Sequence, residues 1–242
     1  MNISDGKIKV GNFELEVVRK DIKNMHLAVY PPMGRVRVSA PERMDDESIR
    51  LFAVSKISWI KKHQKRFREQ EREAPREYVN GESHYFLGKR YLLRVIEHSG
   101  NNKVVVRNKK FLELYVKHGA DQNQRARAMK EWYRRELKKI VPQLLEIWQD
   151  EVGVEAKEWG IKAMRTKWGT CNEKDRRIWL NLELTKKPIA CIEYIIVHEL
   201  VHFFERNHND RFVAYMDRFM PNWRLNRETL NRLPVKHEDW SY

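Results

Sequence analysis

Three histidines and two glutamates stand in a largely apolar segment, YIIVHELVHFFERNHNDRF (194–212). His198, Glu199 and His202 form the pattern H-E-x-x-H. On a helix, side chains four residues apart lie on one face, so both imidazoles can bind the same metal ion. Glu199, the next residue after His198, can reach a water bound to that ion. The pattern therefore predicts metal-dependent hydrolysis, with Glu199 as the general base.

A third ligand is expected because catalytic zinc sites usually have three protein ligands and keep a fourth position for water. His208 follows His202 by six residues, which is the metzincin spacing, but Glu205 stands where metzincins have Gly. We expect Asn207, which tolerates left-handed backbone, to make the turn that returns His208 to the metal. Glu205 lies on the same helical face and is the alternative ligand, or an acceptor for an imidazole N–H.

The nature of these ligands indicates the metal. Imidazole ligands with one open position favour Zn²⁺, and Mn²⁺, Co²⁺, Ni²⁺ or Fe²⁺ could also load in vitro. Burial of the histidines supports metal binding, because neutral imidazoles and a carboxylate rarely lie in a core without a partner.

The elements around this segment predict an α+β fold. A helix opens at Pro188 and is apolar on nearly every side, which indicates that it is buried. Further helices are expected over one stretch after Pro41, over about 122–151 with an N-cap at Asp121, and on both sides of Pro221. Strands are expected in FELEVVRK, HLAVY and RVRVSAP as a small antiparallel sheet, in two hairpins around Gly88 and Asn108, and in IKAMRTKW and RRIWLNLEL with a polar loop over 169–176.

These elements suggest two parts. An N-terminal β-rich part with one amphipathic helix would span 1–118, and a zincin-like catalytic part with a central active-site helix would span 119–242. The boundary is soft, and the whole chain could form one compact unit.

Composition narrows the setting. The 242 residues include 48 basic and 34 acidic side chains, for a formal net charge of +14, which suits nucleic acid or an acidic substrate without choosing between them. The sequence shows no signal peptide and no window apolar enough to span a membrane. Only two cysteines occur, Cys171 and Cys191, which favours reduced thiols and a cytoplasmic location.

Four segments together resemble the YgjP-like predicted metal-dependent hydrolases, a zincin-type family also called YgjP-like metallopeptidases and related to SprT-like proteases. They are RTKWGTCN (165–172), IWLNLELTKKP (178–188), YIIVHELVHFFERNH (194–208) and RFVAYMDRFMPNW (211–223). The resemblance implies His198, His202 and His208 as ligands and Glu199 as the catalytic carboxylate.

The resemblance also draws attention to KWGTCN. Thr170 stands where the family usually has Ser, and Lys167 where Arg is frequent. Trp168, Gly169 and Cys171 could line the metal cleft and bind substrate, with backbone N–H groups near Gly169 stabilising an oxyanion. Alternatively, Trp168 and Cys171 pack beneath the active-site helix.

Three functions remain open on the sequence alone. The first is a zinc peptidase acting on peptides or proteins. The second is a hydrolase of nucleotides or their phosphoanhydrides. The third is a nucleic-acid-associated module with a structural metal, for which basic windows with interleaved aromatic residues at 56–76 and 125–139 would supply the contact surface.

Overall fold

The computed structural model describes residues 5–11, 13–30, 34–69, 76–164 and 167–232. It divides into two compact units, with the division between Glu71 and Arg72. The sequence alone predicts a soft boundary at 118–119 instead. The difference arises because alternating hydrophobicity identifies strands without saying which core they cover, and the strands between 83 and 116 share a core with the second unit.

The first unit is a four-stranded sheet covered by two helices. Its strands are β1 (Asp5–Val10), β2 (Phe13–Lys20), β3 (His26–Tyr30) and β4 (Arg35–Pro41), in the order β1-β2-β4-β3. The pair β3–β4 is antiparallel as expected, β1 adds an antiparallel edge strand to β2 that was not predicted, and β2 and β4 run parallel. Side-chain alternation shows which face is buried, and it does not show the direction of the neighbouring strand.

The helical stretch after Pro41 forms two helices and not one, α1 (Asp46–Ser55) and α2 (Ile57–Glu69). Asp45 caps α1 by accepting from the Ser48 N–H, and the helix ends at Lys56. Ile49 and Ala53 of α1 and Ile60 of α2 are fully buried on the sheet, where they close the core of this unit.

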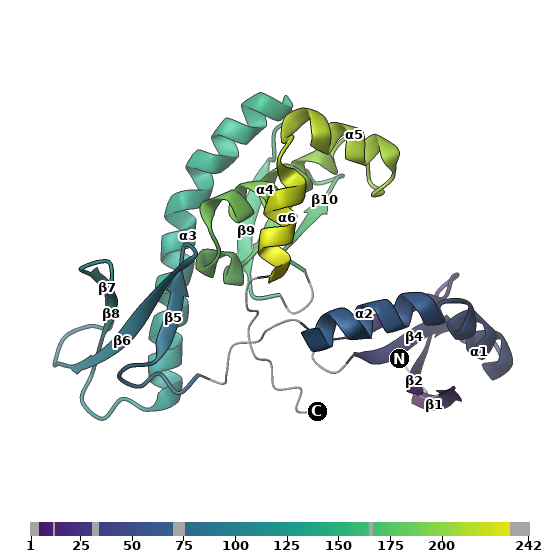
Figure 1. Cartoon of the computed structure of the whole chain (residues 1–242), viewed down its shortest axis with the longest axis horizontal. Helices are drawn as coiled ribbons and strands as arrows, with labels where there is room; N and C mark the ends of the chain where they lie inside the picture. The colour runs from purple at the N-terminus through teal and green to yellow at the C-terminus, as the bar shows by residue number, and fades with distance from the viewer. Residues whose placement is uncertain (1–4, 12, 31–33, 70–75, 165–166, 233–242) are drawn as a thin grey trace. The chain divides into compact units, whose positions relative to one another are not determined.

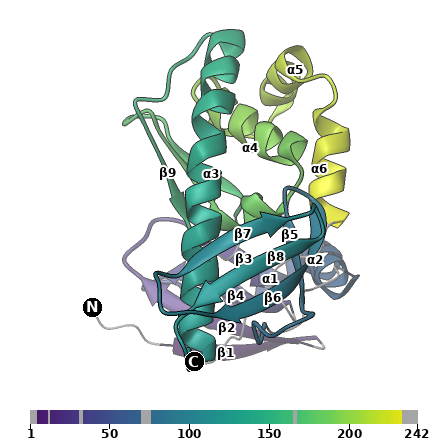
Figure 2. The same ribbon diagram turned by 90° about the vertical axis from the view of Figure 1, so that its left-hand side faces the viewer.

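The second unit is organised around the long helix α3 (Gln122–Val152), which begins and ends close to the predicted residues. Asp121 and Gln124 form a capping box at its start, and Gly153 ends it in the left-handed conformation. Pro142 lies inside the helix. One side of α3 carries a second sheet, β5 (Ser83–Phe86), β6 (Lys89–Glu97), β7 (Lys103–Arg107) and β8 (Phe111–Val116), which crosses the helix in Figure 2. Both predicted hairpins are present.

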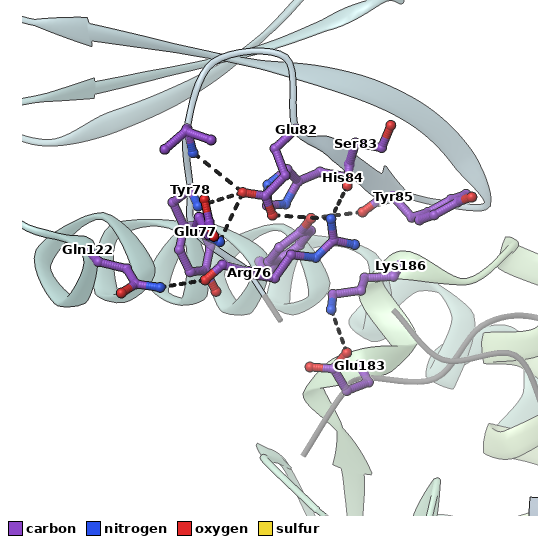
Figure 3. Close-up of polar contacts among 12 residues, drawn as sticks. Arg76, Glu77, Tyr78, Glu82, Ser83, His84, Tyr85, Gln122, Glu183 and Lys186 are labelled. Atoms are coloured by element: carbon purple, nitrogen blue, oxygen red, sulfur yellow. Dashed lines mark hydrogen bonds and ion pairs between the residues drawn. The ribbon is translucent and has the colours of Figure 1, made fainter. Parts of the chain in front are cut away.

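The half-buried carboxylate of Glu82 fixes the chain as it enters β5. Glu82 accepts backbone N–H groups of Glu77, Tyr78 and Val79 at 3.1, 2.5 and 3.4 Å, and Arg76 lies 3.2 Å from its other oxygen (Figure 3). Several donors on one carboxylate hold this turn in place, including the left-handed backbone at Tyr78 (φ 56°).

The turn of the β5–β6 hairpin braces the start of the predicted active-site helix. The N–H of Leu87 donates to the Thr185 carbonyl at 2.9 Å, and that of Gly88 to the Lys186 carbonyl at 3.0 Å. Both acceptors belong to the short 3-10 helix η1 (Leu182–Lys186). A side chain at Gly88 would come within 2.7 Å of the Pro188 ring, so glycine permits this approach, and φ there is +78°.

A third sheet lies in the same unit, with β9 (Glu158–Lys162), β10 (Gly169–Asn172) and β11 (Arg177–Asn181) in the order β10-β11-β9. Residues 163–168, predicted as strand, are not in a strand where the structure describes them, and the predicted loop 169–176 contains β10. Arg165 and Thr166 lie outside the described residues. The strand β10 is short, polar and at the edge of its sheet, so it leaves almost no alternating pattern in the sequence.

Helix α4 (Ile189–Val201) lies centrally in this unit, between α3 and α6 (Trp223–Arg232), with α5 (Asp210–Phe219) following it (Figure 1). Its buried residues include Ile192, Ile196, Val197 and Leu200. The mixed α+β architecture and the central helix therefore agree with the prediction. No helix in the described part of the chain is both long and apolar enough to cross a membrane.

Candidate metal centre

Helix α4 presents the first two histidines. Pro188 precedes its first turn, and the helix continues to Val201, with His202 at its C-cap in right-handed backbone (φ −62°, ψ −17°). Because His202 keeps a helical conformation, it stays one turn above His198, and their ring centroids are 4.9 Å apart. The four-residue spacing in H-E-x-x-H therefore places both imidazoles on one face of α4.

His208 returns to this face through a turn that the sequence analysis placed incorrectly. Asn207 is not among the residues with positive φ. Instead, the chain tightens after α4 through hydrogen bonds from Phe203 to Leu200 and from Phe204 to Val201, both 3.0 Å, so the reversal is spread over several residues and needs no glycine.

Glu205 supports this turn. Its carboxylate accepts the Asn207 N–H at 3.1 Å, and its backbone carbonyl lies 3.1 Å from Nδ1 of His202. An N–H at Nδ1 donated to that carbonyl leaves Nε2 of His202 free to bind a metal. The Glu205 carboxylate does not belong to the group of potential ligands formed by the three histidines.

The three imidazoles meet at one point. Their ligand atoms lie within 4.8 Å of one another, and Nε2 of His198 is 3.0 Å from Nε2 of His208. Two ligands on a tetrahedral zinc with Zn–N bonds of about 2.0–2.1 Å are about 3.3 Å apart, so the observed spacing suits a shared ion. A set of three nitrogen donors fits a divalent transition metal and does not fit Mg²⁺ or Ca²⁺, which prefer oxygen.

The surroundings keep the imidazoles in the form that binds metals. Burial lowers the pKa of His198 to about 3, and the neighbouring His202, His208 and Arg227 act in the same direction. Burial, His202 and Arg227 also lower the pKa of His208. Neutral rings have a lone pair available, so the cluster is ready for a cation at neutral pH.

Glu199 lies beside the cluster with only 4% of its surface exposed. Burial raises the pKa of its carboxyl to about 8, and the positive charge of Lys167 opposes that rise. A divalent cation bound by the adjacent histidines would favour the carboxylate further. The group is therefore held in an environment where gain and loss of a proton are both accessible near neutral pH.

The KWGTCN segment forms the opposite wall of a pocket of about 480 Å³ that contains the three histidines and Glu199. Trp168, Gly169 and Cys171 all line it, and the Trp168 ring is also partly buried against the core. Burial raises the pKa of the Cys171 thiol to about 12, which keeps it neutral. A Cβ at Gly169 would lie 2.5 Å from Oε1 of Glu199, so glycine brings the backbone against the carboxylate.

Comparison with known protein families gives a match over most of the chain. The model of the YgjP-like family, described as "YgjP-like, metallopeptidase domain", matches residues 23–233. The chain belongs to the YgjP-like metallopeptidase family.

Membership in the YgjP-like family makes this protein a metal-dependent hydrolase. Among solved structures, the chain is similar to the metallopeptidase zymogen of Pyrococcus abyssi abylysin, with 23% identity and a TM-score of 0.34, over 38% of this chain and 90% of that one. No curated protein matches.

Three residues of this YgjP-like centre escaped the sequence analysis. Asn181 is buried, and its amide donates to the carbonyls of Met164 at 2.9 Å and Lys167 at 2.7 Å, which fixes the segment leading into β10. Tyr194 and Arg227 line the pocket from α4 and α6. Asn181 carried a signal, the L-N dipeptide before a helix, whereas nothing in the local pattern around Arg227 distinguished it from other arginines.

Proposed function

We propose that this protein is a zinc metallopeptidase in which His198, His202 and His208 bind the metal ion and Glu199 is the general base. The observation that carries the proposal is the position of Glu199. Its carboxylate is buried in the pocket wall next to three converging imidazoles, and a buried carboxylate of raised pKa is suited to accepting and returning a proton.

Each group has a chemical role. A zinc ion bound here would polarise the scissile carbonyl and lower the pKa of water. Glu199 accepts a proton from the attacking water and passes it to the leaving amine. The hydrogen bond between His202 and the Glu205 carbonyl orients that imidazole, and the backbone of Gly169 limits where the Glu199 carboxylate can lie.

The edge of the third sheet supports a peptide as substrate. The Asn181 N–H donates to the Trp168 carbonyl at 2.9 Å, which sets the alternation of the β10–β11 ladder. By that alternation, the backbone groups of Gly169 and Cys171 point to the open side of β10, and both residues line the pocket. A peptide in extended conformation can hydrogen-bond to such an edge, whereas a nucleotide cannot use it as a strand.

The test uses zinc-loaded protein with casein as an unfolded substrate and ATP as a nucleotide. Glu199→Gln should retain zinc and lose about 10²–10⁴-fold in casein cleavage, the usual contribution of a general base. Glu193→Gln is the matched control, because Glu193 lies on the same helix outside the pocket and accepts from Trp148 Nε1 at 3.4 Å. It should cleave casein normally.

Three outcomes would contradict the proposal. ATP hydrolysis that depends on Glu199, without casein cleavage, would favour a nucleotide hydrolase. Full casein cleavage by Glu199→Gln would show that Glu199 is not the general base. Loss of folding on chelation, with no hydrolysis of either substrate, would indicate a structural metal.

A further inference from the structure

Helix α6 places an arginine in the pocket of the metal centre. Arg227 lines the same pocket as His198 and Glu199. The helix is anchored one turn earlier, where the buried ring of Trp223 stacks on Tyr194 of α4, with centroids 6.3 Å apart and an interplanar angle of 12°. The Arg227 guanidinium lies 5.9 Å from the centre of the Trp223 ring. The cation is thus carried by a rigid element and not by a loop.

Arg227 differs from the other cationic residues that line the pocket in having no acidic interaction partner among the described residues. Arg206 has Glu173 at 3.8 Å, and Lys167 acts on Glu199, whose pKa it lowers. Those two cations each have an acidic neighbour. Arg227 has no ion pair within the part of the chain that the structure describes.

Other arginines on α6 show that this absence is particular to the pocket. Arg224 binds Asp217 through both of its terminal nitrogens, and Arg232 lies 3.3 Å from Glu228. Both line a second hollow, which shares Arg227 and Asn231 with the metal pocket, and neither of them lines the metal pocket itself. Among the arginines of α6, Arg227 is therefore the one that could form an ion pair with an anion entering the pocket.

The charge of Arg227 reaches the reacting region. Its side chain lines the same pocket as His198, His208 and Tyr194. A cation close to a divalent ion raises the electrostatic energy of the site unless an anion accompanies them. The substrate is the component that can supply this anion.

We propose that Arg227 is a specificity-determining residue that binds a carboxylate of the substrate close to the cleaved bond. The enzyme would prefer peptides with an acidic side chain, or a free C-terminus, at that place. The planar guanidinium can hold a carboxylate through two parallel hydrogen bonds, a geometry that lysine cannot reproduce. This inference rests on the peptidase function proposed above and names its substrate class.

The experiment uses peptides built on a casein site that the enzyme cleaves. The first pair differs in having Glu or Gln beside the scissile bond. The second pair ends at the same distance from that bond, with a C-terminus that is either free or amidated. Wild-type protein should prefer one charged peptide over its neutral partner, and the pair that shows the preference identifies the carboxylate. Arg227→Gln should lower kcat/KM for the charged peptide by at least about tenfold, the usual loss of a charge-assisted hydrogen bond, and leave the neutral peptide within about twofold.

Two variants and one binding measurement complete the design. Arg227→Lys should restore only part of the preference, and Arg232→Gln, which removes an equal charge outside the pocket, should leave it unchanged. The tryptophan fluorescence of metal-free Glu199→Gln protein gives the Kd of the same peptides without hydrolysis. Kd for the charged peptide should rise with salt, and Arg227→Gln should abolish the difference between partners.

Equal kcat/KM of the wild-type protein for the charged and neutral peptides would overturn the inference. An equal loss of kcat/KM for both peptides in Arg227→Gln would also overturn it. The binding measurement separates this failure from that of the function proposed above. If the wild-type protein cleaves no peptide, the peptidase function fails, and a Kd that is the same for casein-derived charged and neutral peptides then refutes the role of Arg227 as well.

Discussion

The contact between Gly169 and Glu199 leads to a prediction that separates activity from stability. In Gly169→Ala, the new Cβ would lie 2.5 Å from Oε1 of Glu199 and 2.9 Å from its Cδ and Cγ, whereas ordinary contact begins at 3.4 Å. The carboxylate must therefore withdraw by about 0.9 Å. The φ angle at Gly169 is not in the left-handed region, so alanine causes no backbone strain, and the steric contact is the whole perturbation.

The expected effect on catalysis is large. A displacement of about 1 Å at a reacting group can cost about 10²-fold in rate. We expect kcat on a casein-derived peptide to fall by about that factor. The stability cost should stay within about 1–3 kcal/mol, the usual range for overpacking, since the group that moves is the end of a side chain. Zinc content should not change, because no histidine is touched.

Gly160→Ala is the matched control. In β9 of the same sheet, the added Cβ would lie 2.2 Å from the ring of Trp179, which is a worse clash with no contact to Glu199. This variant should lose more stability in thermal unfolding and keep its kcat per folded molecule. If Gly169→Ala kept full kcat, or lost activity only in proportion to zinc, the positioning of Glu199 by Gly169 would be refuted.

Three further predictions concern the support of the site. Glu205→Ala should change zinc affinity by less than about threefold in a chelator competition, because the contact to His202 comes from the backbone carbonyl, which alanine keeps. In contrast, His208→Ala removes an imidazole and should weaken zinc affinity by at least about 10²-fold. Comparable losses in the two variants would make the Glu205 carboxylate a ligand. Asn181→Ala should destabilise the fold by about 2–4 kcal/mol in urea unfolding, since its two amide hydrogen bonds are buried; a loss below 1 kcal/mol would contradict this. Hydrogen bonds from Arg224 and the Trp223 indole lower the pKa of Asp217 from its usual 3.8, so they stabilise the fold above that pH and this stabilisation is lost as the pH falls below it. The melting temperature of Asp217→Asn should therefore depend less on pH below about 4 than that of the wild type, and parallel curves would refute the assignment.

The sequence allowed most helices and hairpins to be predicted because each leaves a local signal. Helix α3 was placed within a residue or two by its capping residue Asp121 and its 3.6-residue pattern, and the hairpin at Asn108 by its turn residues. The strand β10 and the parallel pairing of β2 with β4 were missed, because both depend on neighbours distant in sequence.

The same distinction applies to the site. His198 and His202 could be paired in advance because a helix fixes their separation, and His208 because its offset is a known one. The return of His208 without left-handed backbone at Asn207 could not be foreseen, because several weak hydrogen bonds share the turn. Arg227 could not be predicted as a site residue, because it lines the pocket only once α6 packs beside α4.

The contact between the Gly88 turn and Pro188 bears on how this enzyme can be shortened. In the sequence, residues 76–118 belong to the predicted N-terminal β-rich part, but the turn of their first hairpin hydrogen-bonds to η1 just before α4 begins. A fragment starting at 119 would leave two carbonyls of η1 without their donors and would remove the contacts of Trp132 with Phe86 and of Tyr133 with Tyr85. The smallest piece of the chain able to carry the metal centre therefore begins before β5, because a hairpin about a hundred residues upstream supports the start of the helix that carries the first two histidines.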